Sequence, residues 1–201
     1  PRSVSSQILI NISIFKNDRH FKKDRNSKMY LNEVYFWTST IYQWKHLLKK
    51  DKYKQIIIDC LHNLTERKKI KVYGFIIMPN HIHLLWEMIE KNGKELPHAS
   101  FQKYTAHTIQ SDLKINHTDV LAHFKVEEKE RFYRYWQRDP LAVLILDREM
   151  AEQKLNYMHL NPLQSHWNLC QDPKDYYYSS ASFYESGHSE FKFISDYRER
   201  V

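Results

Sequence analysis

The sequence predicts one α+β domain, in which a central antiparallel β-sheet carries packed α-helices. Two runs rich in Ile, Val and aromatic residues, 72–78 and 82–86, flank the turn-forming pair Pro79-Asn80 and are typical of neighbouring strands. Residues 51–69 place apolar side chains at the spacing of an amphipathic helix. The chain of 201 residues is long enough to bury one substantial core.

Three further elements are predicted along the chain. Residues 34–41 are aromatic and β-branched, which favours a first strand of the sheet. Pro97 suits the first turn of a helix that runs to about residue 113. Asp147 is a good N-cap for a last helix, and Pro162 ends that helix near residue 160 because proline disfavours helical geometry in the residue before it.

Two histidines stand two positions apart at the second predicted strand: His81 directly precedes residues 82–86, and His83 lies within them. Side chains alternate between the two faces of a strand, so His81 and His83 share one face while the apolar residues Ile82 and Leu84 share the other. Two adjacent imidazoles suit one metal ion. The chain has 12 histidines, so a chance pair on a polar sheet face is the alternative.

Composition favours an anionic partner. The formal net charge is +7, and nucleic acid is the commonest partner of a basic domain. The two cysteines, Cys60 and Cys170, form neither a disulfide framework nor a structural zinc site. No apolar run approaches the roughly 20 residues of a membrane span, so no membrane association is expected.

Residues 131–138 mix three arginines with four aromatic residues. Guanidinium groups pair with phosphates, and aromatic rings stack on unpaired bases, so Arg131, Arg134, Trp136 and Arg138 are candidates for contact with single-stranded DNA. The alternative is that aromatic residues of this stretch, Trp136 included, belong to the core.

Two motifs in the chain carry a family resemblance: Met78-Pro-Asn-His-Ile-His83 and Tyr157-Met-His-Leu-Asn-Pro162. Three weaker blocks accompany them in the same order as in the family: Phe101-Gln-Lys-Tyr-Thr-Ala106, Tyr135-Trp-Gln-Arg-Asp-Pro140 and Asp175-Tyr-Tyr-Tyr-Ser-Ser-Ala181. On these residues the chain resembles the REP-associated tyrosine transposases, a branch of the single-tyrosine HUH transposases. The similarity covers roughly residues 30–184.

The resemblance implies a ferredoxin-like HUH nuclease domain with a defined catalytic set. His81, His83 and Asn161 would hold Mg²⁺ or Mn²⁺, and Tyr157 would attack DNA. Tyr157 and Asn161 are spaced i, i+4, so they share one face of the last helix. Among the 14 tyrosines only the motif singles out Tyr157. Two imidazoles and one amide oxygen would also accept Zn²⁺ or Ni²⁺.

The implied function is transposition: a DNA nickase that cleaves and rejoins single-stranded DNA at palindromic hairpin repeats through a covalent 5′-phosphotyrosine. In the family the helix at 97–113 helps to form the DNA-binding face, which makes the exposed Lys103 a candidate contact. Relatives act as monomers or homodimers in the bacterial cytoplasm. Two alternatives stay open, a catalytically silent hairpin-DNA-binding protein derived from a transposase and a metal-dependent hydrolase that uses water.

The expected domain organisation follows from the same resemblance. Residues 1–28 are expected to be an N-terminal extension outside the fold, since residues 16–28 are basic and show no periodicity. Residues 29–186 would form the HUH transposase domain. Residues 187–201 would be a poorly ordered C-terminal tail.

Overall fold

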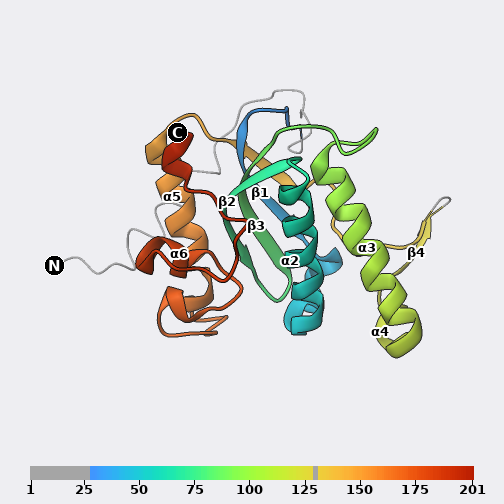
Figure 1. The fold of residues 1–201 in the computed structure, drawn as a ribbon. Coiled ribbons are helices and arrows are strands. Elements are labelled where there is room, and N and C mark those ends of the chain that lie inside the picture. Colours follow the sequence, from blue (N-terminus) through green and yellow to red (C-terminus); the bar gives the residue numbers. More distant parts are fainter. Residues whose placement is uncertain (1–27, 129–130) are drawn as a thin grey trace, which may run out of the picture.

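The computed structural model describes residues 28–128 and 131–201. Residues 1–27, on which the expected N-terminal extension falls, lie outside this part of the chain. Figure 1 shows a twisted sheet with helices on both of its faces.

The strands of the described residues are β1 (Val34–Thr40), β2 (Ile70–Ile77), β3 (His81–Met88), β4 (Lys125–Glu128), β5 (Arg131–Tyr133) and β6 (Leu141–Leu144). The α-helices are α2 (Asp51–Glu66), α3 (Pro97–Asn116), α4 (Thr118–Ala122), α5 (Arg148–His159) and α6 (Ala181–Ser186). Short 3₁₀ turns occupy Tyr42–Trp44, Leu47–Lys49, Asn161–Leu163, Pro173–Asp175 and Tyr197–Glu199.

The main sheet has the strand order β2-β3-β1-β6, and each neighbouring pair is antiparallel. With α2 between β1 and β2, and α3 between β3 and β6, this is the β-α-β-β-α-β arrangement of the ferredoxin-like fold. The predicted α+β class and its antiparallel central sheet are therefore confirmed. A separate hairpin, β4-β5, is inserted between α4 and β6.

Both faces of the sheet are covered. Helices α2 and α3 pack on one face, where Trp37 stacks on Trp86 with ring centroids 5.1 Å apart and both rings are fully buried. Helix α5 packs on the other face, beside Phe36 and Leu85. All residues of β3 are consequently buried, including the two histidines that the sequence placed on the less apolar face. The face of β3 that carries the two histidines is thus covered by α5.

Most predicted elements match the structure within a few residues. The amphipathic helix ends at Glu66, three residues before its predicted end, and the Asp147 side chain accepts a hydrogen bond from the Met150 amide at 2.8 Å as the N-cap of α5. Strand β6 was not predicted. It is only four residues long and lies at the sheet edge, partly exposed, so it lacks the long apolar signal of β2 and β3.

The C-terminal segment corrects one expectation. Residues 187–201 were predicted to be poorly ordered, but Phe193 and Tyr197 are buried, at 4% and 6% exposure. The Ser195 amide bonds to the Val72 carbonyl at 2.8 Å, and the Arg200 guanidinium pairs with the buried carboxylate of Glu87 at 3.1 Å. Buried apolar side chains, a backbone hydrogen bond and an ion pair together attach this segment to the domain.

Within residues 28–128 and 131–201, the helices are all too short or too polar to cross a bilayer.

Candidate active site and nucleic-acid groove

The predicted catalytic tyrosine and histidines lie together between the sheet and α5. His81 and His83 stand two positions apart on β3, on the same face of the strand, and their ring centroids are 4.7 Å apart. The Tyr157 ring meets the His83 ring edge-on at 5.6 Å and the Phe36 ring edge-on at 6.1 Å. Residues that are far apart in the sequence thus form one cluster.

Each imidazole is held by a hydrogen bond to its Nδ1 atom. His81 Nδ1 lies 2.6 Å from Asn80 Oδ1, and His83 Nδ1 lies 2.7 Å from Thr38 Oγ1. Each ring therefore has its Nε2 atom left for another partner. The buried His83 Nε2 has no hydrogen-bond partner within the described part of the chain. A buried imidazole nitrogen without a partner, on a ring held through its other nitrogen, is the arrangement of a metal ligand.

Burial keeps both imidazoles neutral. It lowers the pKa of His81 to about 4, with a smaller contribution from the charge of His166. Burial also lowers the pKa of His83 well below its usual value, and His81 and Lys154 lower it further. A metal ion binds only the deprotonated nitrogen, so neither ring has to lose a proton at neutral pH to become a ligand.

Asn161 begins the 3₁₀ turn that follows α5, one helical turn beyond Tyr157. The residue is 4% exposed, and its amide Nδ2 has no partner among the described residues. Those residues contain no cluster of three His, Cys, Asp or Glu side chains. An amide oxygen is suitable as a third protein ligand, and two imidazoles with one amide oxygen leave coordination positions for substrate and water.

Tyr157 is 50% exposed, in contrast to the buried His81 and His83. Partial burial raises the pKa of Tyr157 above its usual value, which disfavours the phenolate. A tyrosine in this setting needs a nearby cation to ionise.

We expect Thr38→Val to reduce divalent-metal affinity about 10–100-fold, because it removes the hydroxyl that orients His83. Titration with Mn²⁺ measures this affinity. Ser39→Ala is the matched control, because the Ser39 hydroxyl accepts its bond from Gln102 on the opposite face of the sheet. Equal metal affinity in Thr38→Val and in the unmodified protein would show that Thr38 does not support a metal ligand.

His159 does not join the cluster although it is two residues from Tyr157. It is 9% exposed, and its Nε2 lies 2.8 Å from the Ser180 hydroxyl. Burial lowers the pKa of His159 from 6.5 to about 4. The role of this side chain is therefore structural.

The buried His159 predicts a loss of stability in acid. The unfolded chain takes up a proton near pH 6.5, whereas the folded chain resists protonation until about pH 4, so the free energy of unfolding falls as the pH drops through this window. Between pH 8 and pH 4 we expect His159→Gln to lose about 3 kcal/mol less than the unmodified protein, measured by urea unfolding. Identical pH dependence of the two proteins would contradict this assignment.

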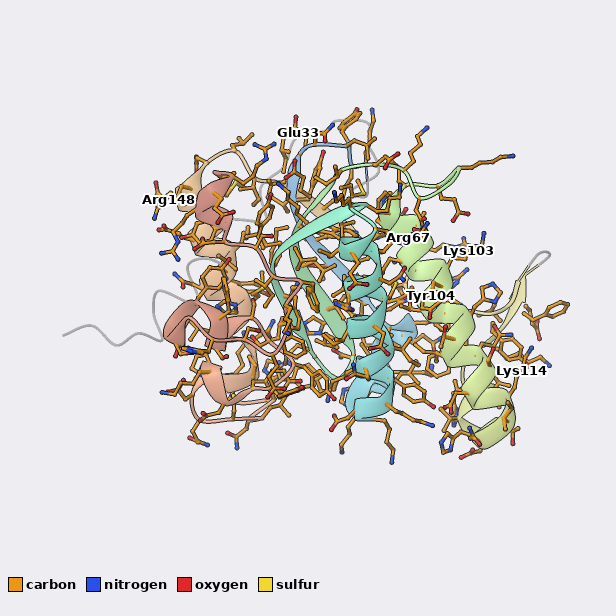
Figure 2. All side chains as sticks on the ribbon, in the orientation of Figure 1. Glu33, Arg67, Lys103, Tyr104, Lys114 and Arg148 are labelled. Atoms are coloured by element: carbon orange, nitrogen blue, oxygen red, sulfur yellow. The ribbon has the colours of Figure 1, made fainter. Side chains whose placement is uncertain are left out.

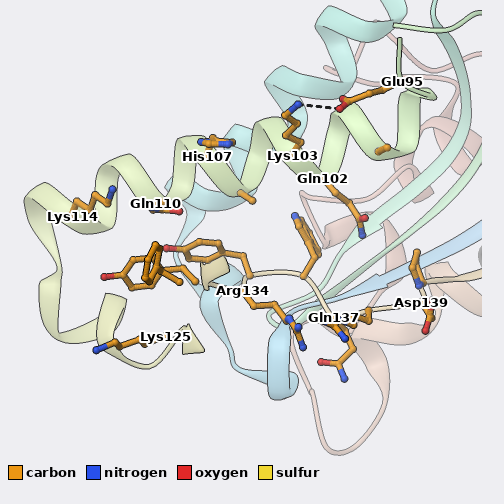
Figure 3. A pocket seen from close by; sticks show the side chains of 18 residues that line it. Glu95, Gln102, Lys103, His107, Gln110, Lys114, Lys125, Arg134, Gln137 and Asp139 are labelled. Carbon is orange, nitrogen blue, oxygen red and sulfur yellow. Dashed lines mark hydrogen bonds and ion pairs between the residues drawn. The ribbon is translucent and has the colours of Figure 1, made fainter. Parts of the chain in front are cut away.

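A groove of about 1170 Å³ runs between α3 and the segment 132–140 (Figure 3). Several basic side chains line it: Lys103, Lys114, Lys125, Arg134 and Arg138. Figure 2 shows Lys103 and Lys114 on the opposite side of the molecule from Arg148 of α5. The groove is therefore separate from the histidine–tyrosine cluster.

The candidate DNA contacts have different positions. Lys103, Arg134 and Arg138 line the groove, and Lys103 also pairs with Glu95 at 3.0 Å. Arg131 belongs to β5, but its side chain lies outside the described part of the structure. Trp136 also lines the groove, but it is 6% exposed and its indole nitrogen donates to Thr105 Oγ1 at 3.0 Å, so little of its ring is available to stack on a base. Phe132, at 75% exposure, is the accessible aromatic residue instead.

Sequence reasoning missed several residues that the structure brings to these sites. Thr38 and Asn80 orient the histidines, and Lys154 of α5 extends over Phe36. Asn80 stands beside His81 in the motif, which is a signal in the sequence. Nothing in the sequence pairs Thr38 or Lys154 with His83, because these contacts depend on strand register and on the docking of α5.

Comparison with solved structures is consistent with this description. The chain is similar to a REP-associated tyrosine transposase bound to a REP hairpin, with a TM-score of 0.53 and 12% identity over 89% of this chain and 93% of that one. A second similar structure is a "putative transposase" from Deinococcus radiodurans R1, with a TM-score of 0.38 and 17% identity over 68% of this chain and 95% of that one. No protein-family model and no curated protein sequence matches the chain. The chain has the fold of the REP-associated tyrosine transposase.

Proposed function

We propose that this protein is a transposase that nicks single-stranded DNA at palindromic hairpins and rejoins strands through Tyr157. The observation that carries the proposal is the contact of a half-exposed tyrosine ring with His83, a buried imidazole whose Nε2 has no partner among the described residues. A core packing role explains neither the exposure of the tyrosine nor the orphaned nitrogen. A nucleophile beside a metal ligand explains both.

The proposed reaction exchanges one phosphoester for another. As the Tyr157 hydroxyl loses its proton, its oxygen forms a bond to phosphorus, and the bond from phosphorus to the 3′ oxygen breaks. The 3′ oxygen takes a proton and leaves as a hydroxyl, while the 5′ phosphate stays on the tyrosine. Since the covalent link conserves the phosphodiester energy, attack by another 3′-hydroxyl can rejoin the strand without ATP.

The chain's residues divide the work of this reaction. Asn80 and Thr38 hold the rings of His81 and His83, so that both Nε2 atoms are available to a divalent ion, for which we propose Mg²⁺ or Mn²⁺. Asn161 would supply the third protein ligand. A bound cation withdraws charge from the phosphate and favours the phenolate over the phenol. Tyr157, on the rigid helix α5, supplies the nucleophile.

The groove beside α3 is the proposed path of the DNA. The similar transposase was solved with a REP hairpin, and the basic groove of this chain suits the phosphate backbone of such a ligand. The Gln137 amide donates a hydrogen bond to the Thr40 carbonyl at 2.7 Å. The segment that lines the groove therefore lies beside the end of β1, the β-strand that carries Thr38. A strand in the groove would pass around the β6 edge to reach Tyr157.

We expect Phe132→Ala to weaken single-stranded DNA binding about 5–100-fold, because stacking of one base on one aromatic ring contributes about 1–3 kcal/mol. Fluorescence anisotropy at one fixed salt concentration measures this affinity. Ile115→Ala is the matched control: Ile115 is an apolar residue of α3 with 80% exposure that does not line the groove. Equal affinity of the Phe132→Ala and Ile115→Ala variants would exclude the groove as the stacking site.

A cleavage assay tests the proposed function. Hairpin DNA labelled on the 5′-phosphate side of the cleavage point is incubated with the protein and Mn²⁺ or Mg²⁺, and the products are separated on a denaturing gel. We expect a protein-linked labelled band that disappears when a chelator is added. Cleaved DNA without this band would indicate a water nucleophile, and hairpin binding without cleavage would indicate a catalytically silent DNA-binding protein.

A further inference from the structure

Lys154 lies on the same helix as Tyr157, three residues earlier, and its ammonium group extends into the candidate active site. Its Nζ atom is 5.5 Å from the centroid of the Phe36 ring. That ring stacks on His83 at 5.1 Å and meets Tyr157 edge-on at 6.1 Å. Phe36 therefore places the ammonium, a catalytic imidazole and the proposed nucleophile around one aromatic ring.

Among the described residues, the charge of Lys154 has no counterion. Within the part of the chain that the structure describes, its ammonium makes no hydrogen bond or ion pair. Arg148 on the same helix shows the usual alternative, a pair with Glu152 at 2.9 Å. The residues three and four positions from Lys154 on α5 are Ala151, Met150, Tyr157 and Met158, so the helix offers it no carboxylate.

Partial burial makes the positive charge of Lys154 unfavourable unless an anion binds beside it. Partial burial lowers the pKa of Lys154, and the charge of Lys154 in turn disfavours protonation of His83. A partly desolvated cation that contacts an aromatic ring but no anion weakens folding, so this position favours a ligand of opposite charge. The phosphodiester that must reach Tyr157 is such a ligand.

We infer that Lys154 binds a non-bridging oxygen of the scissile phosphate, which makes it a catalytic residue in addition to Tyr157 and the two histidines. This inference rests on the proposed function. The phosphate carries one negative charge in the substrate and gains a second as the bond from the Tyr157 oxygen to phosphorus forms. The ammonium keeps its protons throughout and stabilises the added charge.

The test compares the rate of adduct formation at saturating hairpin DNA for four variants. Lys154→Met keeps the length of the side chain without the charge, Lys154→Gln is a second neutral variant, and Lys154→Arg restores the charge. Lys91→Met is the control for loss of a lysine, because Lys91 is exposed and follows the end of β3 remote from His81. We expect both neutral variants to react about 10²–10³-fold more slowly, Lys154→Arg to recover most of the rate, and Lys91→Met to be unchanged.

A substrate with a neutral methylphosphonate at the scissile position distinguishes charge stabilisation from a structural role. On this substrate we expect Lys154→Met to lose less than about tenfold relative to the unmodified protein, because there is one charge fewer to stabilise. Loss of the same factor on both substrates, or an unchanged rate of Lys154→Met on ordinary DNA, would overturn the inference alone. If the unmodified protein forms no adduct on its hairpin DNA, the proposed function fails and the role of Lys154 fails with it.

Discussion

The Tyr157→Phe variant is expected to form no covalent adduct with hairpin DNA, a loss of at least about 10⁴-fold in the rate of strand cleavage. The change removes one oxygen, and with it the only atom that can attack phosphorus in the proposed reaction. The ring contacts with Phe36 and His83 remain, so the free energy of unfolding should change by less than about 0.5 kcal/mol. Gel capture of the adduct and urea unfolding measure the two quantities.

Tyr177→Phe is the matched control for this variant. Tyr177 is 51% exposed, nearly the same as the 50% of Tyr157, but its hydroxyl bonds to Glu190 and it takes no part in the histidine cluster. We expect Tyr177→Phe to cleave DNA at the rate of the unmodified protein. An adduct that persists in Tyr157→Phe would remove this tyrosine from the mechanism, whatever the behaviour of the control.

The second large effect is expected for His83→Gln. This substitution replaces the buried imidazole Nε2 with an amide of different reach and geometry, so one of the two proposed imidazole ligands is lost. We expect Mn²⁺ binding to fall below detection by calorimetry and the cleavage rate to fall by about 10³-fold, which corresponds to the several kcal/mol that a metal ion contributes to such a reaction.

His98→Gln separates loss of a metal ligand from loss of any partly buried histidine. The pKa of His98 is also lowered by burial, but the residue contacts Met88 at the far end of β3 from His81. This control should bind Mn²⁺ and cleave DNA normally. Undiminished metal binding by His83→Gln would show that the orphaned Nε2 is not a ligand.

Sequence reasoning was most effective where local patterns decide the structure. The long apolar runs on either side of Pro79-Asn80 predicted β2 and β3, and alternation along β3 placed His81 and His83 on one face. The cap at Asp147 predicted the start of α5. These features depend on neighbouring residues alone, so a single sequence contains them.

Features that depend on tertiary packing were missed or misassigned. Whether an aromatic residue of 131–138 is buried depends on α3, which covers Trp136 and leaves Phe132 exposed. Docking of α5 on the sheet decides that Lys154 faces Phe36. The C-terminal segment is held in place by contacts such as that of Arg200 with Glu87, two residues that are 113 positions apart in the sequence.

The choice of Tyr157 among the tyrosines came from its motif and not from a local physical signal. The structure supplies the missing physical reason, since the ring is half-exposed and lies against His83. Exposure, position on a rigid helix and contact with a candidate metal ligand together distinguish it from a buried tyrosine such as Tyr73.

Mass spectrometry of the trapped adduct tests the central claim most directly. After nuclease digestion and trypsin, the fragment 155–174 contains a single tyrosine, Tyr157. We predict that this fragment carries the mass of a 5′-linked nucleotide on Tyr157 when the reaction contains Mn²⁺, and that it is unmodified when the metal is chelated. A nucleotide on another residue, or cleaved hairpin DNA with an unmodified fragment, would contradict a mechanism based on Tyr157.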